Sequence, residues 1–268
     1  MDDAVSLEIL PDGREKIWTH ISDVSRWIRP DSQLMLEAER RMTSMYMPDE
    51  VIGMFPSCLT QGLLSLGAED ISYAFSCGTI LNDKGEIESF EVCPSKIRLT
   101  HRITYDQLDE VLAHSESFSP SSSLGQIPLT SANEDLLRLA RWARLRSAFR
   151  RDERGALDSY LMHKTELSLK VKLAGKNNYH GETAISSILK YGNSPGNSFV
   201  AEFMILMSEV VGQYSSELGA QTRFKIQAPP VSLLPADLLL GDEETPFMRS
   251  NRIIKHLKAA TDSMTAGR

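Results

Sequence analysis

The sequence has few of the features that would place a protein in an oxidising compartment, in a membrane or on a broadly basic surface. Its three cysteines, Cys58, Cys77 and Cys93, show neither the close paired spacing of a zinc site nor the even number of a disulfide framework, so we expect reduced core residues. No apolar run approaches the roughly 18 residues of a membrane-spanning helix. With 29 basic and 36 acidic side chains, the net charge of −7 excludes a globally positive surface for nucleic acid and leaves only local contacts.

Common catalytic motifs and targeting signals are missing as well. There is no G-x-S-x-G elbow, Walker-type phosphate loop, G-x-G-x-x-G fingerprint or H-E-x-x-H helix. His20 and Asp23 are closely spaced, but in a β segment they would lie on opposite faces, and no motif places a nucleophile beside them. No signal segment or Arg-rich presequence follows Met1, so the residues alone predict no compartment.

What is present suffices for a folded domain. A chain of 268 residues with 41% hydrophobic side chains can bury a substantial core, and we expect one domain or most of one. The first half alternates like strands joined by turns at Pro11-Asp12-Gly13 and Asn82–Gly85. The expected elements are strands at 5–10, 17–22, 71–81, 87–92 and 96–103, with helices at 34–42 and 105–112. The pattern predicts an α+β fold in which a mixed, largely antiparallel sheet packs with helices.

The second half, over residues 133–218, is expected to be mainly helical. Residues 115–131 are rich in Ser, Pro and Gly and predict a loop, after which Asn133 can cap a long helix. The remaining expectations are a strand pair near 167–173, irregular backbone at 177–197, and helical runs at 199–218 and 252–260. There is no internal repeat.

Several segments, read in order, resemble one enzyme family. They are Asp2-Asp3-Ala4-Val5-Ser6-Leu7, the run from Ile17 to Ser25, the run from Arg40 to Pro48, Met54-Phe55-Pro56, the run from Leu59 to Leu66, and the run from Arg98 to Asp106. Together they resemble the catalytic domain of the ribonuclease II (RNB-domain) exoribonucleases. The resemblance is strong over 1–113, moderate at 154–158 and 202–206, and weak beyond about 220. The likeness to plant-type organellar members implies a plastid or mitochondrial location.

This resemblance implies magnesium-assisted hydrolysis of single-stranded RNA from its 3′ end to nucleoside 5′-monophosphates. The family places four aspartates in one short loop, and the last two, adjacent and followed by alanine, match Asp2 and Asp3. On the residues alone, such a pair near a chain end is usually a frayed, solvated terminus. With the following segments in family order, we interpret Asp2 and Asp3 as catalytic Mg²⁺ ligands.

Two further positions are matched to RNA contacts in the family. Tyr46 resembles the tyrosine that stacks on a base near the scissile end, although a tyrosine on a sheet surface or in a core is the alternative. Glu202 resembles the glutamate near the terminal ribose, or else it is one polar residue on an apolar helix. A second stacking aromatic of some bacterial members falls at Ser159, which leaves a two-sided clamp in doubt.

One helix is locally basic. Between Glu134 and Arg154 the sequence has seven arginines and four acidic residues. Arg138, Arg141 and Arg144 recur every three residues along one stripe. Such a stripe suits a row of RNA phosphates, and it suits a solvated helix face equally well.

Some parts of the family pattern do not occur in the 268 residues. We find no segment like the family's "T-S-P-I-R-R-Y", whose arginine contacts the scissile phosphate, and no OB-fold module for RNA binding. We therefore expect residues 1–268 to be a partial RNB catalytic domain, incomplete at both ends, and a monomer with RNA as its partner. The open alternatives are an exoribonuclease represented by a partial chain, an inactive RNA-binding or regulatory relative, and a remnant that does not fold stably.

Overall fold

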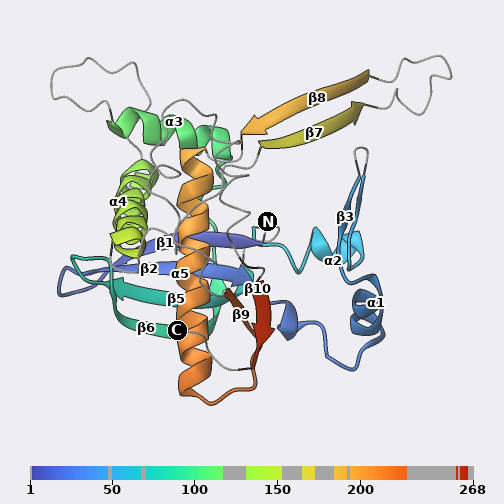
Figure 1. Ribbon diagram of the computed structural model, residues 1–268, viewed down its shortest axis with the longest axis horizontal. Helices are drawn as coiled ribbons and strands as arrows, with labels where there is room; N and C mark the ends of the chain where they lie inside the picture. Colours follow the sequence, from blue (N-terminus) through green and yellow to red (C-terminus); the bar gives the residue numbers. More distant parts are fainter. Residues whose placement is uncertain are drawn as a thin grey trace.

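The computed structural model describes residues 2–47, 50–67, 71–116, 131–152, 165–172, 184–191, 194–227, 258 and 260–264. Within these ranges the chain forms a four-stranded antiparallel sheet with two long helices packed against one of its faces (Figure 1). The predicted α+β class is confirmed. No helix in the described ranges combines the length and hydrophobicity needed to span a membrane.

The central sheet consists of two β-hairpins. Its strands are β1 (Asp3–Ile9), β2 (Glu15–Ser22), β5 (Ser72–Leu81) and β6 (Ile87–Ile97), in the spatial order β1-β2-β5-β6. Both predicted turns are confirmed, and Gly13 and Gly85 supply the positive φ angles of 84° and 89° that these turns require. The expected strand at 96–103 is wrong beyond Ile97, because Ile97 pairs with Ser72, the first residue of β5, and no partner strand continues past it.

A connecting segment, residues 24–71, joins the two hairpins beside the sheet (Figure 1). It contains η1 (Val24–Arg26), α1 (Gln33–Arg41), β3 (Met45–Tyr46), β4 (Val51–Ile52) and α2 (Ser57–Thr60). The α1 helix agrees with the prediction to within one residue, and the Ser32 hydroxyl caps it by accepting a hydrogen bond from the Met35 backbone N–H at 3.2 Å.

Three helices build the core with the sheet. They are α3 (Tyr105–Glu116), α4 (Ser131–Asp152), which begins two residues before the expected cap at Asn133, and α5 (Pro195–Glu217). Helix α5 contacts α3, α4 and three strands of the sheet. Its apolar side, including Phe203, Leu206 and Val210, is fully buried in one core with Ile17 of β2 and Cys77 of β5.

Two predictions about the second half are corrected. Residues 184–191 were expected to be irregular, but they form β8 (Ala184–Tyr191), which pairs residue for residue with β7 (Thr165–Lys172). The irregular stretch was also expected to reach 197, whereas α5 begins at Pro195, because the Ser194 hydroxyl caps the helix and proline favours its first turn.

The expected helical run at 252–260 lies outside the described residues except for 258 and Ala260. Ala260 begins β10 (Ala260–Ser263), which pairs with β9 (Phe224–Gln227). Most of the expected loop, residues 117–130, and Ser159 also lie outside the described ranges.

The three cysteines are free, as expected, but only one is fully buried. Cys77 lies in the core, Cys93 is partly buried and Cys58 is exposed. The prediction of a core position is therefore wrong for Cys58, since the short helix α2 that carries it has no buried residue. Burial raises the pKa of the Cys77 thiol to about 11, which makes it an unreactive, neutral core side chain.

Candidate functional site

Asp2 and Asp3 lie where β1 begins beside the end of β2. Asp3 pairs with Ile21, and the Ser22 N–H donates to the Asp2 carbonyl at 3.0 Å, so β2 holds this part of the backbone. The Asp3 side chain is half-buried on the sheet face that carries α5, because Val5 and Leu7, two and four residues further on, pack against the core. The sheet therefore fixes the position of Asp3, which a frayed terminus would not do.

The electrostatics of the pair suit a cation. The pKa of the Asp3 carboxyl is raised, chiefly because partial burial disfavours its charge and next because Asp2 is negative. A bound cation would relieve both effects. Mg²⁺ binds through one or two carboxylates while keeping several waters, so two adjacent aspartates fit it. No group of three or more His, Cys, Asp or Glu side chains that could hold a metal occurs in the described part of the chain.

Tyr46 lies on the small β3–β4 hairpin, opposite Val51. Its side chain is 81% exposed, so its ring is open to a stacking partner. In Figure 1 this hairpin belongs to the connecting segment and lies outside the four-stranded sheet that carries the aspartates. The stacking role of Tyr46 stays a prediction that its exposure permits.

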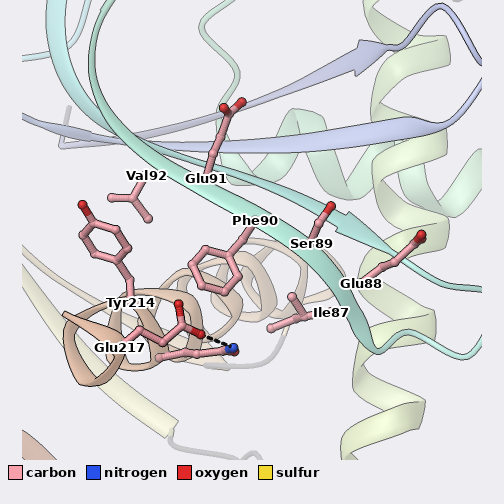
Figure 2. Close-up of a pocket in the computed structure, with 9 residues that line it drawn as sticks. Ile87, Glu88, Ser89, Phe90, Glu91, Val92, Tyr214 and Glu217 are labelled. Carbon is pink, nitrogen blue, oxygen red and sulfur yellow. Dashed lines mark hydrogen bonds between the residues drawn. The ribbon is translucent and has the colours of Figure 1, made fainter. Parts of the chain in front are cut away.

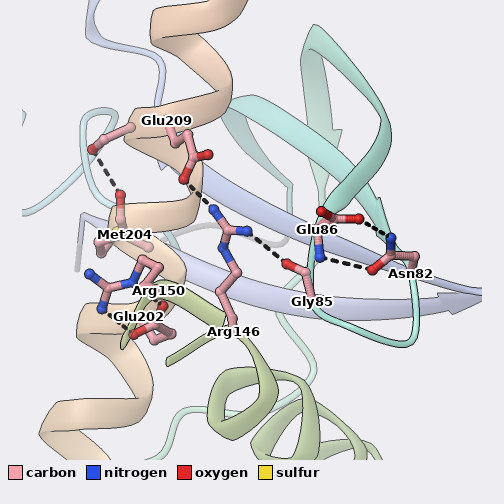
Figure 3. A network of polar contacts seen from close by, with 9 residues as sticks. Asn82, Gly85, Glu86, Arg146, Arg150, Glu202, Met204 and Glu209 are labelled. Atoms are coloured by element: carbon pink, nitrogen blue, oxygen red, sulfur yellow. Dashed lines mark hydrogen bonds and ion pairs between the residues drawn. The ribbon is translucent and has the colours of Figure 1, made fainter. Parts of the chain in front are cut away.

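Glu202 lies between α4 and α5, where it is 2% exposed. Both of its carboxylate oxygens accept hydrogen bonds from Arg150, at 2.8 Å from Nε and 2.7 Å from Nη2 (Figure 3). The role of Arg150 was not predicted from the sequence; its position on the apolar side of the helix was the one sign of burial. The ribose contact of Glu202 stays a prediction, and this buried, bidentate pair gives the residue a structural role.

A second buried arginine joins three elements. Arg146 of α4 donates to the Gly85 carbonyl in the β5–β6 turn at 2.7 Å and forms an ion pair with Glu209 of α5 (Figure 3). Its guanidinium also lies 5.0 Å from the centre of the Phe149 ring. Two of the arginines that make α4 basic, Arg146 and Arg150, are therefore buried in contacts between elements of the fold.

The predicted arginine stripe is tied to neighbouring carboxylates. Arg138 pairs with Glu134 at 2.7 Å and with Glu15 at 3.3 Å, while Arg141 pairs with Glu15 at 2.9 Å. Arg144 is exposed and is engaged in a contact as well. These pairs favour a solvated helix face over a row of phosphate-binding sites, and RNA contact by the stripe stays a prediction.

The opposite face of the sheet carries a row of hydrogen-bonded polar side chains, of which His20 and Ser76 are buried. His20 lies between the hydroxyls of Ser6, 3.0 Å from Nε2, and Ser76, 2.7 Å from Nδ1, and the Ser76 hydroxyl is hydrogen-bonded to that of Ser95. Burial lowers the pKa of His20 to about 4. His20 is thus neutral near pH 7, which suits a structural role.

A cavity of about 430 Å³ lies between β6 and the last turns of α5 (Figure 2). Its walls include Glu88, Glu91 and Glu217, which pair with Arg14, Lys16 and the Gln213 side chain respectively. None of the residues predicted to bind metal or RNA lines this cavity, so we do not place the RNA site here.

The fold agrees with a family comparison. The RNB domain matches residues 1–244, and the chain belongs to this family of ribonucleases. Ribonuclease II, chloroplastic/mitochondrial, of Arabidopsis thaliana is 32% identical over 260 residues, which cover 97% of this chain and 29% of that relative. The chain spans 29–31% of the length of three ribonuclease relatives that it matches.

Solved structures share the fold. Mycoplasma genitalium RNase R in complex with ribose methylated single-stranded RNA matches 98% of this chain and 42% of its own, with a TM-score of 0.72 and 17% identity. Yeast Ssd1, a pseudonuclease, matches 98% of this chain and 32% of its own, with a TM-score of 0.67 and 18% identity. The same backbone therefore occurs in an RNA-bound ribonuclease and in a pseudonuclease.

Proposed function

We propose that this chain belongs to a 3′-to-5′ exoribonuclease that hydrolyses single-stranded RNA to nucleoside 5′-monophosphates, with Asp2 and Asp3 as ligands of Mg²⁺. The observation that carries the proposal is the pair of adjacent aspartates, whose backbone lies beside the end of β2 in an RNB-family sheet. The ribonuclease names of the relatives support the reaction class.

Each proposed residue has a physical task. Bound magnesium supplies Lewis acidity toward the phosphate and a polarised water. Asp2 and Asp3 provide the hard oxygen ligands, and the backbone that carries them is fixed by its pairing with the end of β2. Tyr46 offers an exposed ring on which a base near the 3′ end can stack, whatever its sequence.

A second candidate is a catalytically inactive RNA-binding or regulatory relative. It is favoured by the likeness to the pseudonuclease Ssd1. The two candidates share RNA binding and differ in hydrolysis.

We also propose a plastid or mitochondrial location, which the name of the Arabidopsis relative supports. Import of the radiolabelled, full-length translation product into isolated organelles would test it. A product that remains outside both organelles would contradict this location.

Hydrolysis and binding are tested together with residues 1–268 joined to the family segments that the pattern lacks, and with a uniformly labelled single-stranded RNA. Asp3→Asn keeps the size of the side chain and removes one anionic ligand, so Mg²⁺-dependent release of monophosphates should fall at least about a hundredfold while RNA affinity in EDTA persists. Asp83→Asn is the matched control, because Asp83 is exposed in the β5–β6 turn.

Three outcomes separate the candidates. Hydrolysis that Asp3→Asn abolishes and Asp83→Asn spares supports the exoribonuclease. RNA binding without hydrolysis supports the inactive relative. Hydrolysis at an equal rate in all three proteins shows that Asp3 is not a metal ligand.

A further inference from the structure

A second cavity, of about 340 Å³, opens at the same end of the sheet as Asp3. Its lining consists of Gly62, Leu63 and Ser65 from the connecting segment, Ile71, Ser72 and Tyr73 at the start of β5, and Lys96 near the end of β6. No residue of this cavity belongs to the site described above.

Strand pairing fixes the position of the cavity relative to Asp3. Asp3 pairs with Ile21 and Ile21 pairs with Phe75, so these three residues form one row across β1, β2 and β5. Tyr73 lies two residues beyond Phe75 on the same face and pairs with Lys96. Tyr73 therefore lies two strands across the sheet from Asp3 and two residues along the strand. This spacing places their Cα atoms about 12 Å apart.

The surface between them is apolar and accessible. Ile21 and Phe75 are 39% and 37% exposed, although the same face is fully buried at Cys77, where α5 covers it. One strand of RNA that reaches Asp3 along this face would therefore pass apolar and aromatic side chains before it meets the cavity.

Tyr73 is held rigidly in the cavity wall. The edge of its ring meets Trp27, with ring centres 5.5 Å apart, and the Arg26 guanidinium lies 4.5 Å from its centre. Arg26 is itself paired with Asp23 at 3.2 Å. A wall fixed in this way loses little conformational entropy when a ligand binds.

Lys96 supplies a positive charge at the rim. Its side chain is exposed, with Nζ 5.7 Å from the centre of the Tyr73 ring. It has no carboxylate partner among the described residues, unlike Lys16, Arg138 and Arg141. In a chain of net charge −7, this is a local site for an anion.

We propose that the Tyr73–Lys96 cavity binds one nucleotide of the single-stranded RNA, with a backbone phosphate at Lys96 and the base against Tyr73, Leu63 and Ile71. The inference rests on the proposed function, because the RNA strand is the one that Asp2 and Asp3 act on. An aromatic and apolar wall with one cation accepts any base, so the cavity contributes affinity without sequence preference.

The test measures the affinity of the 268-residue chain for a fluorescent 12-nucleotide single-stranded RNA in EDTA at several salt concentrations. Lys96→Gln should weaken binding and lower the slope of log K against log salt by about 0.7, the contribution of one phosphate contact on a single strand. Tyr73→Leu should weaken binding roughly fivefold or more at every salt concentration with the slope unchanged.

Matched controls separate the cavity from general charge and from folding. Lys84→Gln removes an exposed lysine at the other end of the same sheet and should leave affinity and slope unchanged. Tyr73→Phe keeps the ring and should bind like the unaltered chain. Photocrosslinking with 4-thiouridine RNA, read by mass spectrometry, should place a crosslink on a cavity peptide without any substitution.

The outcomes distinguish this inference from the proposed function. If Lys96→Gln and Tyr73→Leu bind RNA like the unaltered chain while Asp3→Asn loses hydrolysis, the cavity is no RNA site and the exoribonuclease stands. If both variants lose affinity in a chain that does not hydrolyse RNA, RNA binding by the cavity is supported and the proposal of hydrolysis is contradicted. Crosslinks confined to other peptides would also overturn the cavity.

Discussion

The sheet face packed by α4 and α5 differs from the connecting segment in how far its apolar side chains are exposed. On the packed face, Phe203, Leu206 and Val210 are fully buried, and even two arginines are buried there in ion pairs. In the connecting segment, Met42, Tyr46 and Val51 are among the most exposed apolar side chains of the described residues. Stability therefore depends mainly on the packed face, and the connecting segment offers surface for binding. Substitutions in the two regions should affect different measurements.

The largest expected effect breaks the buried pair on the packed face. Arg150→Met leaves the Glu202 carboxylate buried without its partner, which should lower the free energy of unfolding by about 3–5 kcal/mol. Urea denaturation followed by circular dichroism measures the loss. The double variant Arg150→Met with Glu202→Leu removes both charges and should recover most of the stability. A single variant within about 1 kcal/mol of the unaltered chain would contradict the assigned role.

The next effect depends on pH and arises on the other face of the sheet. The pKa of His20 is lowered to about 4 in the folded chain from an unfolded value of 6.5, so its contribution to stability is fully present above pH 6.5. Between pH 6.5 and 4 the unfolded chain takes up a proton that the folded chain does not, and this contribution is lost as the pH falls. Urea midpoints at pH 7.5, 6, 5 and 4 should therefore fall more steeply than those of His20→Gln. Parallel curves for the two proteins would contradict this prediction.

A smaller effect is expected for a substitution in the connecting segment, and it should appear in RNA affinity and not in stability. Tyr46→Ala should leave the urea midpoint unchanged because the ring is exposed, yet weaken RNA binding by roughly 1–3 kcal/mol through loss of a stacking face. Met42→Ala is the matched control, since Met42 is equally exposed but has no ring. Equal RNA affinity of the two variants would show that Tyr46 is an exposed side chain that does not stack on a base.

The smallest effect is expected at the arginine stripe. Arg141→Gln breaks an exposed ion pair with Glu15, so its stability should change by no more than about 1 kcal/mol and its RNA affinity very little. RNA binding at several salt concentrations provides the measurement. A clear drop in affinity with a lower salt slope would restore the interpretation of the stripe as a phosphate-binding surface.

Local signals in the sequence predicted much of the sheet. The turns at Gly13 and Gly85 and the alternation on either side of them predicted β1, β2 and β5 to within two residues at each end. The missed strand β8 shows the limit of such signals, because residues 184–191 are stabilised by pairing with β7 and not by a periodic pattern of their own. The end of β6 was misplaced for a similar reason, since it depends on where its partner begins.

The candidate site was only partly accessible from sequence. Asp2, Asp3, Tyr46 and Glu202 were proposed from their order in a family pattern, and their roles stay predictions. The ion-pair partners of the predicted charged residues were not predicted, because they are far away in the sequence. Arg150 lies 52 residues from Glu202, and Glu15 lies 126 residues from Arg141. Distance in the sequence also separates Tyr73 from Lys96 and both from Asp3, so the cavity they share becomes visible only when the strands are paired.

The chain of side chains through His20 has a further consequence for the aspartates. Ser6, His20, Ser76 and Ser95 come one from each strand of the sheet, so their hydrogen bonds align all four strands against one another. A slip of β1 by one residue would move Ser6 to the helix-covered face and Asp3 to the opposite one. The uncharged His20 side chain thus helps to fix the register of β1, and the face of the sheet on which Asp3 lies depends on that register.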